Sequence, residues 1–170
     1  LKLVFNSSSM TITLQPIGTI HTPFSDTAGM PVQPVGASGV CGTITIRPDL
    51  AAGLADLDGF SHIILIYYLH QVTACKLTVT PFLDPHAHGV FATRAPVRPN
   101  PIGLSTVRLL KREETTLHVE NVDMLYGTPL LDIKPYIPAV DHHAVERAGW
   151  FDQVNLDDYQ FRADTRFSEP

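Results

Sequence analysis

A stiff polar stretch carries the side chains best suited to gripping a ligand. Arg94, Arg98 and Asn100 lie between two apolar segments, with three prolines among and just after them. Each proline fixes its own φ, removes a backbone N–H and biases the preceding residue towards extended geometry. Donors on a stiffened loop bind a ligand at a lower entropic cost. A rigid surface crossover with solvated arginines explains the same residues, so the pattern alone leaves both interpretations open.

A second candidate region contains two carboxylates and two tyrosines. Asp123 and Asp132 bracket the segment YGTPLL, where they can either brace a turn or take part in chemistry. Tyr126 and Tyr136 flank the same turn. Aromatic rings beside polar groups suit stacking on a splayed RNA base, although both rings can equally belong to the core.

Metal and thiol chemistry are not expected. His86 and His88 form an HxH pair like that of a metal-binding cupin barrel, but residues 89–94 supply no carboxylate ligand. Cys41 and Cys75 match no metal or redox spacing. We therefore expect two reduced thiols, which suits a cytoplasmic protein.

Two further classes of chemistry find no support in the chain. Ser61 and Ser105 lie in no recognisable nucleophile elbow, and neither cysteine has a placed histidine. The glycine-rich run GASG at 36–39 has no helical pattern after it, so it does not indicate a phosphate loop.

The elements that must position these side chains are short strands with frequent Gly and Pro turns. This pattern predicts an all-β fold, mainly strands with short helices, in a barrel or sandwich. Residues 62–69 are expected to be buried on both faces, residues 21–39 to form a long loop, and Asp49 to cap a helix over 50–57. A second short helix is expected over 141–148. Strands are expected at 11–20, 39–46, 62–69, 76–82, 102–110, 116–124 and 130–136.

Length and charge limit the classes of protein. The chain has 170 residues, 44% of them apolar, and a net charge of −5. We expect one globular domain at 11–150, an N-terminal extension at 1–10 and a polar tail at 151–170, with no membrane span. The negative charge argues against a general nucleic-acid binder. Local attraction remains open because five basic residues cluster between 94 and 112.

Three segments in order resemble the signatures of the tRNA N6-threonylcarbamoyladenosine methyltransferase family. They read FSHIILIYYLHQ at 60–71, FATRAPVRPNPIGLS at 91–105 and DMLYGTPLLDIKPYIP at 123–138, and the likeness runs from about 12 to 150. The resemblance implies a small β-barrel of about six to seven strands that binds S-adenosyl-L-methionine without a doubly wound fold. It also implies a homodimer with the cofactor near the subunit interface, tRNA as partner, and no metal or membrane.

The resemblance also implies the site residues. Arg94 would bind the methionine carboxylate, the backbone near Val122 the adenine, and Asp123 or carbonyl oxygens the sulfonium. Arg94 and Asp123 are the best catalytic candidates, and no catalytic residue is otherwise assigned. The expected cofactor residues are Gln33, Pro34, Val35, His70, Gln71, Arg94, Leu104, Asn121, Val122, Asp123 and Met124. The expected RNA-side residues are Arg98, Asn100, Lys134 and Tyr136.

The implied reaction moves a methyl group to the exocyclic nitrogen of threonylcarbamoyladenosine beside the tRNA anticodon. That nitrogen belongs to a urea-like group, so its proton leaves more easily than in adenine. Orientation can supply roughly 7–11 kcal/mol, more than a single general base. Two alternatives stay open, namely another methyl acceptor at the same pocket and a non-catalytic barrel that binds a ligand or partner through the proline-rich loop.

Overall fold

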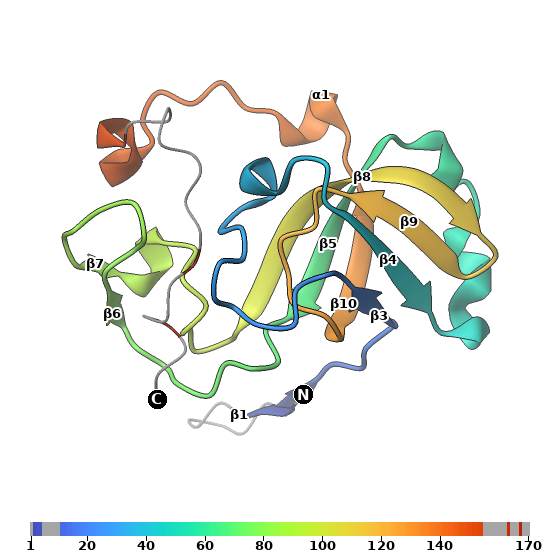
Figure 1. Cartoon of the computed structure of the whole chain (residues 1–170), viewed down its shortest axis with the longest axis horizontal. Helices are drawn as coiled ribbons and strands as arrows, with labels where there is room; N and C mark the ends of the chain where they lie inside the picture. Colours follow the sequence, from blue (N-terminus) through green and yellow to red (C-terminus); the bar gives the residue numbers. More distant parts are fainter. Residues whose placement is uncertain (1, 5–10, 155–162, 164–166, 168–170) are drawn as a thin grey trace.

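The chain folds around a closed six-stranded antiparallel barrel (Figure 1). The computed structural model describes residues 2–4, 11–154, 163 and 167. The strand order around the barrel is β10-β3-β4-β9-β8-β5. The expected all-β barrel is therefore confirmed. Its strands are β3 (Gly18–His21), β4 (Cys41–Ile46), β5 (His62–Tyr68), β8 (Ile102–Glu113), β9 (Thr116–Glu120) and β10 (Thr128–Pro135).

Short elements surround the barrel. Strands β1 (Lys2–Val4) and β2 (Thr11–Thr13) pair with each other, as do β6 (Thr78–Val79) and β7 (His88–Gly89). The helices are η1 (Pro34–Ala37), η2 (Pro48–Leu54), η3 (Leu57–Gly59), η4 (Val90–Ala92), η5 (Gly149–Gln153) and α1 (Pro138–Asp141), of which only α1 is α-helical. Among the residues described, no helix is both long and apolar enough to span a bilayer.

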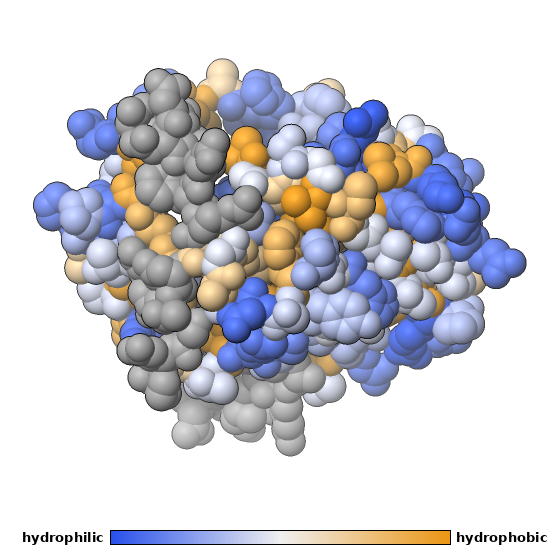
Figure 2. All heavy atoms as spheres, viewed as in Figure 1, coloured by the Kyte–Doolittle hydropathy of each residue, from blue (hydrophilic) through white to orange (hydrophobic). Residues whose placement is uncertain are grey.

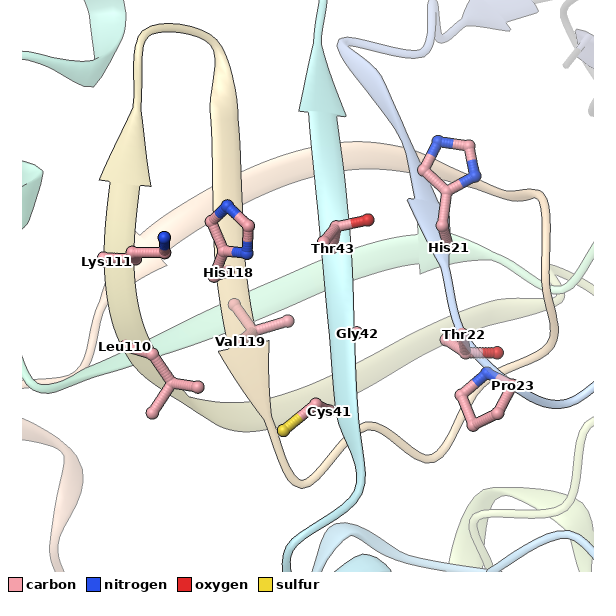
Figure 3. Close-up of a pocket in the computed structure, with 10 residues that line it drawn as sticks. All are labelled: His21, Thr22, Pro23, Cys41, Gly42, Thr43, Leu110, Lys111, His118 and Val119. Atoms are coloured by element: carbon pink, nitrogen blue, oxygen red, sulfur yellow. The ribbon is translucent and has the colours of Figure 1, made fainter.

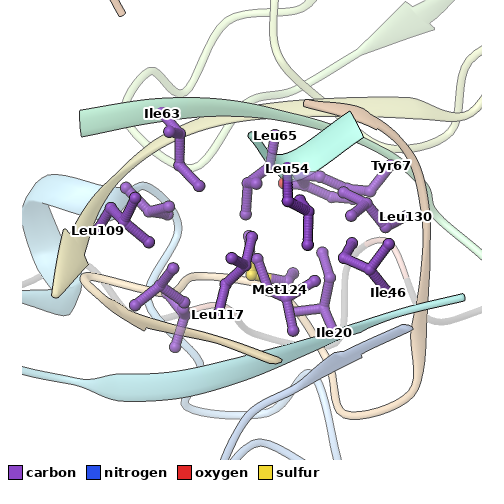
Figure 4. Packing of buried hydrophobic residues seen from close by; sticks show 14 residues of the cluster. Ile20, Ile46, Leu54, Ile63, Leu65, Tyr67, Leu109, Leu117, Met124 and Leu130 are labelled. Atoms are coloured by element: carbon purple, nitrogen blue, oxygen red, sulfur yellow. The ribbon is translucent and has the colours of Figure 1, made fainter. Parts of the chain in front are cut away.

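The barrel interior is filled by alternate apolar side chains of its strands (Figure 4). In β5, Ile63, Leu65 and Tyr67 are buried in the core, whereas Ile64 and Ile66 point outward and are half-buried. The prediction that β5 is buried on both faces was thus only partly right. Its outer face is apolar although the barrel itself covers only the inner one.

Several expected elements differ for local reasons. The helix expected at 50–57 is two 3-10 segments, and Asp49 does not cap it but pairs with Arg47 at 2.6 Å. Gly53 inside this stretch disfavours a continuous α-helix. Strand 11–20 splits into β2 and β3 around Pro16, which cannot donate to a ladder. The second helix forms earlier than expected, as α1, because Pro138 suits the first helical position.

Two further differences concern strand ends. The strand expected at 76–82 is reduced to the two residues of β6, since Pro81 follows closely. The strand expected at 116–124 ends at Glu120, and Asn121 has a φ of 69°, in the left-handed region. This turn carries residues 122–124 out of the ladder and across the end of the barrel. Within the N-terminal extension, residues 2–4 form β1, and the other residues lie outside those described.

The connections divide between the two ends of the barrel. Because the strands are antiparallel, residues 22–40, 69–101 and 121–127 all leave and re-enter the barrel at one end, which we call the loop end. The hairpin between β8 and β9 and the segment 47–61 lie at the other end, which we call the closed end. The loop end lies on the left of Figure 1 and the closed end on the right. At the closed end, Leu54 of η2 packs into the core.

Candidate functional site

Arg94 of the proline-rich loop meets the long loop 22–40 at the loop end. Its Nη1 donates to Oε1 of Gln33 at 2.9 Å, across 61 positions of sequence. The preceding residue, Thr93, is buried, donates its hydroxyl to the carbonyl of Val90 and accepts the N–H of Ala95. The backbone on both sides of Arg94 is therefore fixed while the guanidinium stays exposed.

Arg98 holds the proline-rich loop together from inside. Its Nη1 donates to the carbonyl oxygens of Thr93 at 2.9 Å, Ala95 at 3.1 Å and Val90 at 3.4 Å. The residue is half-buried. One guanidinium nitrogen thus satisfies carbonyls of the loop's own backbone, a structural role that the sequence did not indicate. The expected contact of Arg98 with RNA stays a prediction.

The segment 121–124 is tied to the long loop at both of its ends. The side-chain oxygen of Asn121 accepts the N–H of Gly39 at 3.0 Å, and the hydroxyl of Thr22 donates to the carbonyl of Met124 at 2.8 Å. The side chains of Val122 and Met124 are buried in the core. A ligand at this segment would therefore meet backbone groups, Asn121 and Asp123.

Asp123 ends a buried chain of three polar side chains. Its Oδ1 accepts the hydroxyl of Ser105 at 2.7 Å, and that hydroxyl lies 2.9 Å from the hydroxyl of Tyr67. Burial raises the pKa of Asp123 to about 7, although the Ser105 hydrogen bond and the charge of Arg94 oppose the rise. Burial, followed by the charge of Asp123, raises the pKa of Tyr67. Arg94 is thus close enough to influence both groups.

The other expected cofactor residues belong to the connections at the loop end, with one exception. Pro34 and Val35 belong to η1, and His70 and Gln71 follow β5 at the loop end. Leu104 differs from them, because it lies on the outer face of β8 with 55% of its surface exposed, whereas its neighbour Ser105 points inward. Leu104 and Asp123 therefore lie on opposite faces of the barrel wall.

The expected RNA-side residues are split between the two ends. Arg98 and Asn100 lie in the proline-rich loop, whereas Lys134 pairs with Asp132 near the closed end at 2.9 Å. The N–H of Tyr136 donates to His62, the first residue of β5. Because β5 covers the length between the ends, Tyr136 is about 20 Å from the loop end. Within one subunit these four residues therefore do not form a single cluster, and their contact with RNA stays a prediction.

Comparison with known proteins places the chain in a family. Residues 19–142 match the family model described as the tRNA-methyltransferase O N-terminal domain. The chain belongs to this family. The resemblance drawn from the three sequence segments is confirmed.

Individual relatives agree with the family match. The chain is 48% identical over 142 residues to a probable S-adenosyl-L-methionine-binding protein of Pyrococcus abyssi, covering 84% of this chain and 77% of that protein. It is 37% identical to the human tRNA (adenine(37)-N6)-methyltransferase, covering 75% of this chain but 30% of the human protein. The crystal structure of TrmO from Pseudomonas aeruginosa superimposes with a TM-score of 0.70 at 38% identity, covering 83% of this chain and 63% of that one. The chain thus spans less than two thirds of the human protein and of the Pseudomonas aeruginosa protein.

A second polar cluster of this TrmO-family chain lies outside the barrel. The carboxylate of Asp84 contacts Nδ1 of His86 at 2.7 Å and Nε2 of His88 at 3.2 Å, and His88 stacks on Trp150 at 5.0 Å between ring centroids. A carboxylate does accompany the HxH pair, but it precedes the pair in sequence. Even so, no group of three or more His, Cys, Asp or Glu able to hold a metal occurs in the part of the chain described.

A shallow hollow of about 520 Å³ lies across β3, β4, β9 and β8 (Figure 3). None of the expected cofactor residues lines it, but it extends to Thr22, whose hydroxyl donates to the carbonyl of Met124. Its lysine and one of its histidines are both paired with Glu113, at 2.6 Å and 3.0 Å. Two further basic residues are also paired, Arg108 with Glu120 and Arg112 with Asp58. Neighbouring acids therefore match three of the five basic residues between 94 and 112, whereas Arg94 and Arg98 bind uncharged groups.

Proposed function

We propose that this TrmO-family chain transfers a methyl group from S-adenosyl-L-methionine to N6 of threonylcarbamoyladenosine beside the tRNA anticodon. One structural observation carries the proposal beyond family membership. Arg94, Gln33 and the segment 121–124 come from three distant parts of the sequence and converge at one end of the barrel. The relatives' names, which include S-adenosyl-L-methionine-binding proteins and a tRNA methyltransferase, support it as well.

The side chains at the loop end fit the chemistry of this cofactor. It presents a carboxylate, an adenine and a sulfonium, and it supplies the methyl group. The exposed guanidinium of Arg94 suits the carboxylate through a charge-assisted hydrogen bond. Backbone groups beside Val122 suit the adenine edge, and the ionised carboxylate of Asp123 suits the sulfonium. Gln33 orients Arg94 for this contact.

We also propose that the working form is a homodimer. Leu104, implied as a cofactor residue, lies on the outer face of β8 together with the half-buried Ile64 and Ile66 of β5. A second copy covering this apolar face would bring Leu104 of one subunit to the loop end of the other. Light scattering should give twice the monomer mass, and Leu104→Asp should reduce it to that of the monomer. A monomeric wild-type protein would refute this part of the proposal.

The residues at the loop end act mainly by positioning. With the donor held by Arg94 and the acceptor base held in line with it, the reaction gains the large orientation term available to two fixed reactants. Closing the loops over the pair also keeps water away from it, which strengthens every charge interaction there. We propose that the protein works in the cytoplasm, since its proposed substrate is tRNA.

The decisive assay is methyl incorporation into bulk tRNA from cells that lack the activity, followed by nucleoside analysis. Methylated threonylcarbamoyladenosine is the expected product. Calorimetry with S-adenosyl-L-methionine separates the failures. Binding in the micromolar range without tRNA methylation would mean a different acceptor, and absence of binding would mean a non-catalytic ligand-binding barrel.

A further inference from the structure

Three polar side chains are buried together inside the barrel at its loop end. Tyr67 of β5 is 5% exposed, Ser105 of β8 is 2% exposed, and Asp123 beyond β9 is 9% exposed. Buried polar groups lower stability unless they are paired, and a linked set of three in an otherwise apolar core is costly to retain. Stability alone would favour apolar residues at these three positions, so the hydrogen-bonded set of Tyr67, Ser105 and Asp123 calls for a functional explanation.

The position of the Tyr67 hydroxyl is set by the sheet. Tyr67 pairs with Gly103 across the β5–β8 ladder, and a side chain at Gly103 would collide with the tyrosine ring. The ring therefore lies over the glycine, which brings its hydroxyl to within 2.9 Å of the Ser105 hydroxyl. Glycine weakens a strand, so its presence here is explained by this close packing.

While Asp123 is ionised, the donor and acceptor roles in this set of three hydrogen-bonded side chains are fixed. A serine hydroxyl has one proton, and Ser105 donates it to Oδ1 of Asp123. Ser105 must then accept from the hydroxyl of Tyr67. Burial and the charge of Asp123 raise the pKa of Tyr67, so the tyrosine stays protonated and continues to donate. One carboxylate oxygen is thus held in place by two donors in series.

Burial of Asp123 brings its pKa close to neutral pH, against the effect of the nearby charge. Arg94 from the proline-rich loop and Tyr67 from β5 are the titratable groups that act on it, and Ser105 from β8 is its uncharged partner. Burial raises the pKa of Asp123 to about 7 and outweighs the Ser105 hydrogen bond, a backbone hydrogen bond and the charge of Arg94, which all favour the anion. A base with its pKa near the working pH is the most effective one.

We propose that Asp123 accepts the proton released by the acceptor nitrogen, and that Ser105 and Tyr67 are positioning residues that aim its carboxylate. In this step the nitrogen lone pair forms the new N–CH3 bond while the S–CH3 bond breaks and its electrons remain on sulfur. The N–H proton passes to the carboxylate of Asp123 and is lost to solvent after the product leaves. This inference rests on the methyl transfer proposed above.

The pH dependence of kcat/KM tests the proposed roles of Asp123, Ser105 and Tyr67. Wild-type activity should rise with pH to a plateau, with a midpoint near the pKa of Asp123. Because the Ser105 hydrogen bond lowers that pKa, Ser105→Ala should move the midpoint up by about one pH unit and cut the rate at pH 7 by roughly fivefold, as the ionised fraction falls. Tyr67→Phe should move it in the same direction by less, and Ser105→Thr should restore the wild-type midpoint.

A matched control comes from the closed end. Ser61 is exposed there and contacts the ring of His62, so Ser61→Ala should leave the profile unchanged. Unchanged midpoints in both Ser105→Ala and Tyr67→Phe would overturn the inference. So would an Asp123→Asn variant with more than a third of wild-type activity. If Ser105→Ala fails to fold, Tyr67→Phe and Ser105→Thr still decide the outcome.

A measurement without substrate separates this inference from the proposed function. The carboxyl carbon of Asp123, followed by NMR in the protein alone, should titrate near pH 7 and move to higher pH in Ser105→Ala. If the protein fails to methylate tRNA but shows this titration, the proposed function is wrong, and the conclusion that Ser105 and Tyr67 orient the Asp123 carboxylate is retained. If methylation occurs and neither the titration nor the pH profiles respond to the variants, the inference fails and the function stands.

Discussion

The two ends of the barrel are built in opposite ways. At the closed end, β8 and β9 are joined by a two-residue turn and η2 places Leu54 in the core. Charges there are paired on the surface, as in the ion pair between Arg47 and Asp49. At the loop end, the connections 22–40, 69–101 and 121–127 leave the barrel on the same side (Figure 1), and the last of them carries the buried Asp123. In the same view, hydrophilic side chains surround the closed end and apolar ones gather over the middle of the face (Figure 2).

We infer from this comparison that the closed end mainly provides stability and that the proposed binding site lies at the loop end. Apolar burial and tight turns at the closed end add stability at little cost. The loop end keeps Asp123 buried, although burial disfavours its charged form. Functional sites commonly combine loops on a rigid frame with perturbed carboxylates. The variants below challenge this division, in order of decreasing effect.

The largest effect is expected from Arg94→Ala. Losing the charge-assisted contact with the cofactor carboxylate should lower kcat/KM by roughly 10²- to 10³-fold, with no change in stability because the side chain is exposed. Arg47→Ala at the closed end is the matched control and should retain full activity. Alanine at any one of the eight histidines should do less harm than Arg94→Ala. An inactive histidine variant that still binds the cofactor would contradict this ranking.

Leu54→Ala should lower stability and leave activity unchanged. Removing a core side chain at the closed end should lower the free energy of unfolding by about 3 kcal/mol. Urea denaturation measures this loss. The remaining folded protein should keep its kcat and KM at low temperature. A tenfold fall in kcat under folding conditions would mean that the closed end also shapes the site.

Asp123→Asn should alter how stability depends on pH. The carboxyl pKa is about 7 in the folded protein against 3.8 for a free side chain. Its contribution to stability is therefore complete below pH 3.8 and is lost as the pH rises to 7, where the folded state must ionise. Between pH 5.5 and 8.5 the wild-type protein should lose about 2 kcal/mol that the variant keeps, since one pH unit corresponds to about 1.4 kcal/mol. Parallel urea curves for both proteins at both pH values would argue against a perturbed carboxyl.

The smallest effect is expected from Gln33→Ala. Arg94 would lose its hydrogen-bond partner but keep its charge, so KM for S-adenosyl-L-methionine should rise about five- to tenfold with little change in kcat. Gln15 lies in the chain outside the loop end and is exposed, so Gln15→Ala serves as the control. Equal KM values for the two variants would show that the contact between the loops is incidental.

The sequence predicted the scaffold better than the centre of the site. Alternating apolar residues and proline positions predicted a β-rich barrel or sandwich, and the resemblance of three segments narrowed this to a barrel. All three segments carry residues that reach the loop end. Ser105 was dismissed because it lacked a nucleophile motif, although its place between apolar inward positions of β8 was a usable indication of a buried polar role. The pairing of Tyr67 with Gly103 could not be predicted, because it depends on the register between two strands far apart in sequence.

Mapping of backbone amide NMR shifts while S-adenosyl-L-methionine is added tests the central claim most directly. We predict that the affected residues cluster at the loop end, at 33–35, at Arg94 and at 121–124, while η2 and the turn between β8 and β9 stay unchanged. Shifts confined to the closed end or to the hollow across β3, β4, β9 and β8, or no shifts at millimolar cofactor, would contradict it.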